Sequence, residues 1–233
     1  MKNINSAIAP SRLKLIIIAG TRFILSLLIV VIILFIPAGS LSYWNGWLYL
    51  TALFVPMLFA LIYLIIKDPV LLQKRMNIKE KDEAQKRYVK VSIIFLIITF
   101  IIPGLDYRFK WSDVPQWLVI LAAIVMVLGY IMFVIVMMEN SYASRVIEIQ
   151  PNQKLIDHGL YSIIRHPMYL AASILYGASP IVLGSYYAMI PMMLLPIILA
   201  YRIINEEKLL IEGLEGYKDY MKKVKYRLIP HIW

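Results

Sequence analysis

The chain has 233 residues, of which 61% are hydrophobic and 16% are charged, and its net charge is +10. Soluble domains carry about 45–50% apolar and about 25% charged residues, so this composition excludes an ordinary soluble domain. The chain contains no cysteine, which excludes disulfides, thiolate metal sites, thiol catalysis and palmitoylation. We therefore predict an all-α protein that forms a polytopic bundle of transmembrane helices.

Six hydrophobic segments follow one another along the chain. A helix needs roughly 20 apolar residues to cross a bilayer, and most of the segments reach or approach that length. The third and fifth segments are short and are expected to tilt or to be shielded by neighbouring helices. In chain order, the segments are Leu15–Ile36, Trp44–Ile66, Val89–Pro103, Gln116–Met138, Met168–Leu183 and Tyr186–Ile204. They predict a single bundle of five to six spanning helices.

The last two segments are joined only by Gly184 and Ser185, which predicts a tight helical hairpin. Pro180, Pro191 and Pro196 lie inside this hairpin, and we expect them to kink or locally unwind its helices. Membrane helices tolerate such breaks where neighbouring groups bind the freed carbonyls.

Most of the 24 lysine and arginine residues fall in connections that six spans would place on one side of the membrane. The connections on the other side contain only Arg108 and Lys110. Because cytoplasmic connections carry an excess of basic residues, we predict that both termini are cytoplasmic and that the protein lies in the plasma membrane. Charges sorted in this way indicate contact with membrane lipids and give no reason to expect nucleic acid as a partner.

Two other features have simple structural interpretations. The connection Lys67–Lys90 mixes acidic and basic residues and is expected to form a solvated amphipathic helix that touches lipid headgroups. A set of aromatic residues lies near the outer ends of the segments, as in an interfacial belt. These residues are Trp44, Trp47, Tyr107, Trp111, Trp117, Tyr186 and Tyr187.

The stretch Gly159–Tyr169 is a polar and aromatic connection between two hydrophobic segments. Pro167 fits the first position of a helix, and a residue that precedes proline, here His166, favours an extended backbone. We therefore expect an exposed helix N-terminus, which is a favourable site for a carboxylate or phosphate. In this interpretation Arg165 adds positive charge, and aromatic rings in the stretch offer faces for stacking. In the alternative, Arg165 reaches the lipid headgroups and His166 only caps the helix.

A second polar cluster follows the last hydrophobic segment. Arg202 and Glu206 are spaced i, i+4 and share a helix face, whereas Glu207 points about 100° away. The two glutamates need cationic or hydrogen-bonding partners, which Lys208, Arg227 or a cationic ligand could provide.

The tail and the histidines carry weaker signals. Residues 216–233 interleave aromatic and basic residues, which predicts an amphipathic interfacial helix followed by an extended segment around Pro230. The three histidines are scattered without a ligand pattern, so we predict no metal site.

Several motifs recur here in an order that resembles the isoprenylcysteine carboxyl methyltransferase family, particularly its prokaryotic members. They are Asn140–Ser144, Gly159-Leu160-Tyr161, Arg165-His166-Pro167-Met168-Tyr169, Glu206-Glu207, Gly216-Tyr217 with Tyr220, and Val224–Pro230. The resemblance covers about the last hundred residues. It implies that residues 116–233 form a catalytic region and that residues 1–115 contribute N-terminal transmembrane helices to one continuous bundle.

The resemblance also implies an integral-membrane methyltransferase that binds S-adenosylmethionine at the cytosolic face. Glu206 and Glu207 would hold the cationic amino group of the cofactor or organise the site. The pocket would be lined by Gly159, Leu160, Tyr161, His166, Pro167 and Tyr169.

The acceptor is less well defined by these motifs. A lipophilic, prenyl-like or lipid-like carboxylate would need no general base, and Arg202 would orient it through its guanidinium fork. A phospholipid amine would need to lose a proton, for which Glu206 or His166 are the candidates. Two further alternatives are an NADPH-dependent sterol-type reductase, since such enzymes resemble this region, and a membrane protein without enzymatic activity. The oligomeric state stays open.

Overall fold

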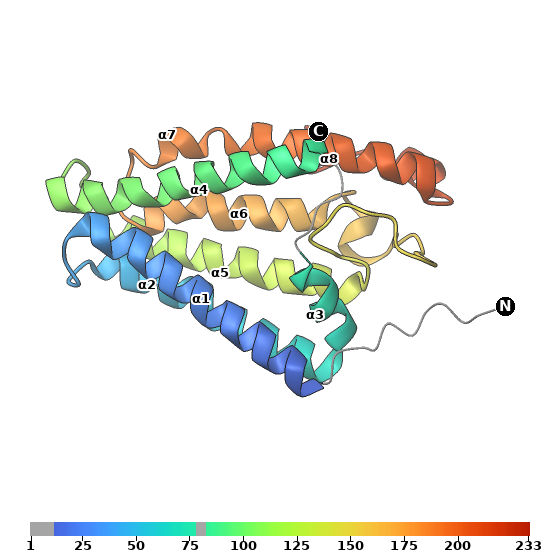
Figure 1. The fold of residues 1–233 in the computed structure, drawn as a ribbon. Helices are drawn as coiled ribbons and strands as arrows, with labels where there is room; N and C mark the ends of the chain where they lie inside the picture. The colour runs from blue at the N-terminus through green and yellow to red at the C-terminus, as the bar shows by residue number, and fades with distance from the viewer. Residues whose placement is uncertain (1–11, 78–82) are drawn as a thin grey trace.

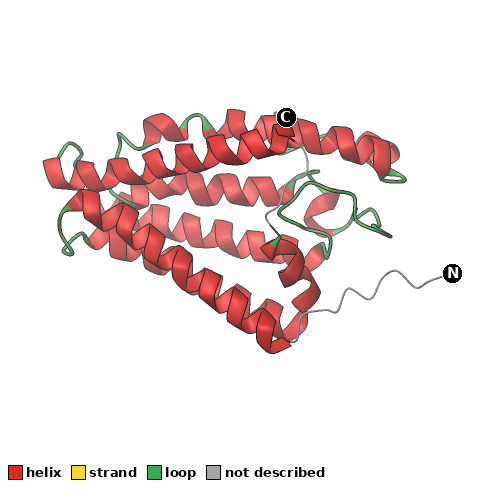
Figure 2. Cartoon of the chain, viewed as in Figure 1, coloured by secondary structure: helices red, strands yellow, loops and turns green. Residues whose placement is uncertain are grey.

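The computed structural model describes residues 12–77 and 83–233, and every regular element in these ranges is a helix (Figures 1 and 2). Five helical stretches are long and apolar enough to cross a membrane, so the protein is an integral membrane protein. This confirms the all-α bundle expected from the sequence. The helices are α1 (Arg12–Ala38), α2 (Trp44–Lys67), α3 (Pro69–Met76), α4 (Glu83–Phe109), α5 (Gln116–Glu139), α6 (Pro167–Val182), α7 (Met189–Met192), α8 (Leu195–Gly213) and α9 (Tyr217–Lys223), with a 3-10 turn η1 (Gly159–Ser162). Lys2, Lys79 and Lys81, which the orientation prediction used, lie outside the described residues.

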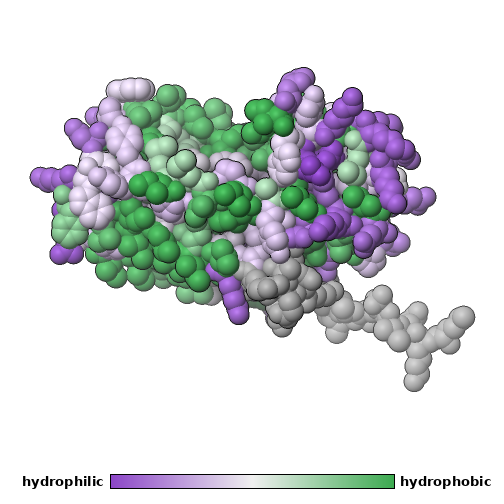
Figure 3. Space-filling view, turned by 90° about the horizontal axis from the view of Figure 1, so that it is seen from above, coloured by the Kyte–Doolittle hydropathy of each residue, from purple (hydrophilic) through white to green (hydrophobic). Residues whose placement is uncertain are grey.

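The core of the bundle lies between α1, α2, α4, α5 and α6. Leu34, Tyr49, Met126 and Val182 are fully buried there, and the most extensive interface joins α5 to α6. The helices are apolar on their outer faces as well, which is typical of helices surrounded by lipid. On the face that Figure 3 shows, hydrophobic side chains cover much of the middle of the bundle, and hydrophilic side chains gather mainly at its two ends.

Two predictions for the first half of the chain are wrong. The third span is not short, because α4 continues from Glu83 through Pro103 to Phe109. The connection Lys67–Lys90 is not one amphipathic helix. It is divided into α3 and the start of α4, because α3 ends at Met76 and Asn77 has an extended backbone. Helix α3 is also separate from α2, since Asp68 accepts a hydrogen bond from the backbone of Leu71 (2.9 Å) and so starts a new helix at Pro69.

The expected hairpin is present at the Gly184-Ser185 turn, where Gly184 has a φ of +72° that suits glycine. Its first arm, α6, is short, as predicted, with Pro180 close to its end. Its second arm is interrupted between α7 and α8, just before Pro196, which confirms local unwinding near these prolines. The second arm then runs on to Gly213, well beyond the predicted end at Ile204.

Three connections meet at the end of the bundle that contains the hairpin turn, which we call the hairpin end. The buried carboxylate of Asp106 accepts hydrogen bonds from the backbone and hydroxyl of Ser112 (2.7 Å each) and from the hydroxyl of Ser185. The hydroxyl of Tyr43 donates to the carbonyl of Leu183. The aromatic residues predicted for the outer interface lie at this end. Most are exposed, whereas Tyr107 packs against Tyr43 with 4.6 Å between ring centroids.

The close approach of α4 to α1 provides a test of the packing. A Cβ on Gly104 would lie 2.7 Å from the carbonyl oxygen of Leu34, whereas a Cβ on Gly177 would meet nothing within 4 Å. We expect Gly104→Ala to destabilise the protein by about 1–3 kcal/mol, because one backbone must shift. Gly177→Ala should leave the stability almost unchanged. Thermal unfolding of both variants in detergent checks this, and equal melting temperatures would contradict the close contact between α1 and α4.

Candidate functional site

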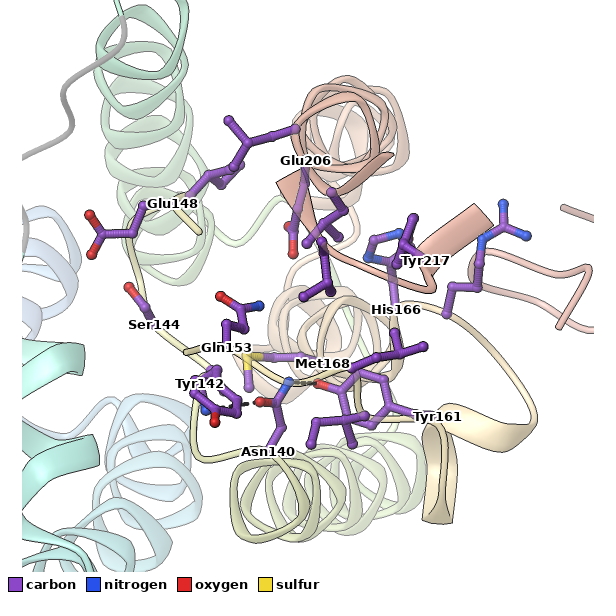
Figure 4. A pocket seen from close by; sticks show the side chains of 18 of the residues that line it. Asn140, Tyr142, Ser144, Glu148, Gln153, Tyr161, His166, Met168, Glu206 and Tyr217 are labelled. Carbon is purple, nitrogen blue, oxygen red and sulfur yellow. Dashed lines mark hydrogen bonds between the residues drawn. The ribbon is translucent and has the colours of Figure 1, made fainter. Parts of the chain in front are cut away.

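A pocket opens at the other end of the bundle, which we call the pocket end (Figure 4). It has a volume of about 900 Å³, including the part that is open to solvent. Its walls come from the loop after α5, the η1–α6 segment, the later part of α8 and the helix α9. The two polar clusters of the sequence therefore meet at one end of the bundle, as predicted.

The carboxylate of Glu207 is the centre of a buried ionic cluster behind the pocket. Its oxygens accept hydrogen bonds from Nε of Arg165 and Nε of Arg227 (2.7 Å each), and Nε2 of His166 lies 3.2 Å away. Glu207, His166 and Arg165 are only 3%, 4% and 7% exposed. The expectation that Arg227 could neutralise one of the glutamates is thus confirmed, while Lys208 is exposed. The cluster joins α8, the start of α6 and the tail.

The tail also covers the start of α6. The backbone N–H groups of Arg165 and His166 donate to the carbonyls of Tyr226 (3.0 Å) and Arg227 (2.9 Å). Helix α6 begins at Pro167, as predicted, but the prediction of an exposed N-terminus is wrong because His166 and Pro167 are buried.

The alternative interpretation of this segment is also excluded. Nη1 of Arg165 donates to the carbonyls of Val224 and Lys225 (2.8 Å each), so Arg165 does not reach the headgroups. His166 occupies the capping position of α6, but its side chain faces Glu207 and makes no capping hydrogen bond in the described structure.

A second hydrogen-bonded group forms the pocket wall between α6 and α8. The hydroxyl of Tyr169 donates to a carboxylate oxygen of Glu206 (2.6 Å) and accepts from Nε of Arg202 (3.1 Å). Arg202 also donates to the carbonyl of Arg145 (2.6 Å) and lies over the ring of Tyr88, 4.8 Å from its centroid. Tyr169 therefore brings a hydroxyl group between Arg202 and Glu206, in addition to the aromatic face expected from the sequence.

The Gly159-Leu160-Tyr161 motif is held by the end of α5. The backbone of Leu160 donates to a carboxylate oxygen of Glu139 (3.1 Å), and a Cβ on Gly159 would lie 2.1 Å from the other oxygen. A larger residue here would push the Glu139 carboxylate away, and Gly159 also has a φ of +58°, which favours glycine. The hydroxyl of Tyr161 accepts a hydrogen bond from Asn140 (2.9 Å), and burial raises the pKa of Tyr161 to about 12. It is therefore a neutral phenol at neutral pH.

The predicted site residues fall into two groups. Those that line the pocket are Tyr161, His166, Tyr169, Arg202 and Glu206. Those that lie behind its described wall are Gly159, Leu160, Pro167 and Glu207. Sequence reasoning assigned no role to several further lining residues, among them Asn140, Tyr142, Gln153, Met168, Tyr217 and Tyr220. All of these except Gln153 lie within the recurring motifs of the sequence, and those motifs were the signal that could have identified them as pocket residues.

The tail differs from its prediction in two ways. Helix α9 is present, but Tyr217 and Tyr220 pack in a protein core with Leu214 and Val224 instead of facing lipid. The segment around Pro230 is a turn, in which the backbone of Arg227 donates to the carbonyl of Trp233 (2.9 Å), and is not extended. Packing against residues of the loop after α5 explains the first difference, since Ile149 and Leu155 contact the same cluster.

The two tyrosines of α9 differ in their hydroxyl groups. The hydroxyl of Tyr220 donates to the carbonyl of Tyr161 (2.6 Å). The hydroxyl of Tyr217 is buried and has no hydrogen-bond partner within the described chain. Burial raises the pKa of both groups, so both are neutral. A buried hydroxyl without a partner in a pocket wall is a group that a polar ligand could satisfy.

The ionic cluster leads to a prediction about stability. We expect Glu207→Ala to destabilise the protein by about 3–5 kcal/mol, because the buried guanidinium group of Arg165 and the half-buried one of Arg227 lose their carboxylate. The matched control is Glu212→Ala on the exposed part of the same helix, which should change the stability little. Thermal unfolding in detergent measures both. If Glu207→Ala is as stable as Glu212→Ala, the cluster is not needed for folding.

Comparison with known proteins identifies the region that contains the pocket. Residues 118–212 match the model of the isoprenylcysteine carboxyl methyltransferase (ICMT) family, and a search of curated proteins finds no match. The matched region runs from α5 to the end of α8 and includes both Tyr161 and the group formed by Tyr169, Arg202 and Glu206. Together with the order of the motifs, this shows that residues 118–212 belong to the isoprenylcysteine carboxyl methyltransferase family.

Proposed function

We propose that the protein is a membrane methyltransferase that uses S-adenosylmethionine and methylates a carboxylate on a lipophilic acceptor. The family match supports the reaction type, since the family is described as carboxyl methyltransferases. The observation that carries the proposal is the pocket at the end of a membrane bundle, which combines carboxylate, guanidinium, amide and phenol groups from separate elements. The excess of basic residues in the connections at this end of the bundle supports a position of the pocket at the cytosolic face of the plasma membrane.

The residues of the pocket fit the chemical groups of S-adenosylmethionine. Glu206 is a carboxylate in the wall and suits the cationic amino group of the ligand. Asn140 and Gln153 provide amides for the polar edge of a base or for ribose hydroxyls, and Tyr142 provides a ring for stacking. The hydroxyl of Tyr217 is a polar group that still needs a partner.

The group formed by Tyr169, Arg202 and Glu206 would organise the acceptor. When bound, S-adenosylmethionine supplies an electrophilic methyl group. A carboxylate acceptor is already ionised at neutral pH, so the protein needs to position it and exclude water without removing a proton. Arg202 supplies positive charge at the wall, and its bonds to Tyr169 and Arg145 hold the guanidinium in one orientation.

The hydrogen bonds of the two candidate bases favour a carboxylate over an amine. His166 lies within hydrogen-bond distance of Glu207, and Glu206 accepts from Tyr169, so each side chain is already held by a partner in the protein. An amine acceptor would require one of them to take a proton while giving up that interaction. The surrounding membrane helices suit a lipophilic acceptor, such as a prenylated cysteine, that reaches the site from the bilayer.

Ligand-induced stabilisation tests the proposed cofactor. S-adenosylhomocysteine at a concentration of 100 times its Kd should stabilise the purified protein by about 2.7 kcal/mol, because it binds the folded state only. We therefore expect a higher melting temperature with S-adenosylhomocysteine and no change with NADPH. Stabilisation by NADPH alone would contradict the methyltransferase proposal and support the reductase.

The tyrosines of α9 test the position of the ligand. Tyr217→Phe removes a buried hydroxyl without a protein partner, so we expect the unliganded protein to be as stable as wild type or more stable. Its Kd for S-adenosylhomocysteine should rise roughly fivefold, because the ligand loses one hydrogen bond. Calorimetric titration in detergent measures this Kd.

Tyr220→Phe is the matched variant, since it removes a hydroxyl that binds the carbonyl of Tyr161. We expect it to lower the melting temperature of the unliganded protein. If Tyr217→Phe binds S-adenosylhomocysteine as tightly as wild type, the ligand does not use this hydroxyl.

A further inference from the structure

Helix α3 belongs to the N-terminal half of the chain and contacts the loop that forms part of the pocket wall. It precedes the region that matches the family, and Figure 1 shows it beside the loop that follows α5. Leu71 and Leu72 are buried in a cluster with Met137 of α5 and Ala143 of the loop, and Met168 packs against the same cluster. Apolar contacts therefore seat α3 on the outside of the pocket wall.

Two basic residues of α3 bind the loop directly. Nζ of Lys74 donates to the carbonyl of Ser141 (3.1 Å) and lies 5.1 Å from the centroid of the Tyr142 ring. Nη1 of Arg75 donates to the carbonyl of Ala143 (2.9 Å) and lies 3.7 Å from the sulfur of Met168. Tyr142, Ala143 and Met168 all line the pocket.

Two side chains of α3 and one from later in the same loop hold three consecutive carbonyls of this loop. Lys74 binds that of Ser141, Gln150 binds that of Tyr142 (2.8 Å), and Arg75 binds that of Ala143. The loop lies in neither a helix nor a strand, and its backbone makes local turn bonds, from Ala143 to Asn140 (3.1 Å) and from Ser144 to Tyr142 (2.6 Å). The side-chain bonds add the contacts that tie this turn to the rest of the protein. Two of the three come from α3.

The environment of Arg75 suits a fixed interaction. Its guanidinium lies over the ring of Phe133, 5.0 Å from the centroid, and burial lowers the pKa of Arg75 to about 10. Arg75 therefore stays charged at neutral pH while it is largely enclosed by the protein. A partly desolvated cation forms stronger hydrogen bonds to carbonyls and stronger contacts to aromatic faces than an exposed one.

We propose that Lys74 and Arg75 are positioning residues through which the N-terminal half of the chain holds residues 140–144 in the shape that binds the ligand. The affinity of the pocket would then depend on α3, although α3 lies outside the family match and neither residue lines the pocket. The inference rests on the proposed function only in the choice of S-adenosylhomocysteine as the probe.

Substitution of Arg75 tests the inference. We expect Arg75→Met to raise the Kd for S-adenosylhomocysteine roughly tenfold, because the loop loses a charge-assisted hydrogen bond. Methionine keeps apolar contact with Phe133 and Met168, so the variant should fold. Arg75→Lys keeps the charge but loses the guanidinium fork, and should restore part of the affinity.

The control is Arg108→Met at the hairpin end, where the guanidinium also lies over an aromatic ring, that of Phe109. Its Kd should equal that of wild type. Equal affinities for wild type, Arg75→Met and the control would overturn the inference, even if S-adenosylhomocysteine binds as proposed.

A spectroscopic measurement separates positioning from general stability. The chain has no cysteine, so Ser141→Cys, whose side chain is exposed, provides a unique site for a spin label. We expect the label to become more mobile when Arg75→Met or Lys74→Met is added, and to stay unchanged with Arg108→Met. An immobile label in both α3 variants would overturn the inference. If wild type does not bind S-adenosylhomocysteine, the proposed function fails, and the label mobility alone decides whether α3 holds the loop.

Discussion

The ion cluster around Glu207 is the interaction on which the pocket end of the molecule depends. Two guanidinium groups and an imidazole meet one carboxylate in a buried position: Arg165 and His166 come from the start of α6, and Arg227 comes from the tail. A buried charge is costly without a partner, so these segments must come together or leave uncompensated charges. The cluster thereby closes the tail over the start of α6, and the position of α6 in turn places Tyr169 opposite α8.

The neighbouring glutamates of α8 have different tasks because a helix turns by about 100° per residue. Glu207 faces the protein and holds the tail, whereas Glu206 faces the pocket and accepts the hydroxyl of Tyr169. The fixed, buried cluster thus supports a partly exposed polar group that is available to a ligand. Rigid support behind a binding wall is what a site needs when its contribution is positioning and exclusion of water.

The loop after α5 depends on both halves of the chain. Its carbonyls are held by Gln150 from the same region and by Lys74 and Arg75 from α3. The first half of the bundle thus contributes to the pocket wall as well as to the hydrophobic core. The family match is confined to residues 118–212, but residues on either side of the matched region complete the pocket or hold its wall.

The amino-acid sequence was sufficient to predict the membrane bundle, the hairpin at Gly184-Ser185, the start of α6 at Pro167 and the family of residues 118–212. These features depend on apolar length, on local backbone preferences and on motif order, which are readable along the chain. Three-dimensional packing was needed to show that Glu207 lies behind the pocket, that Tyr169 joins Arg202 to Glu206, that Pro230 lies in a turn and that α3 is separate from α4. Most of these outcomes depend on partners far away in the chain, and periodicity and spacing do not specify which distant carbonyl or carboxylate a side chain will meet.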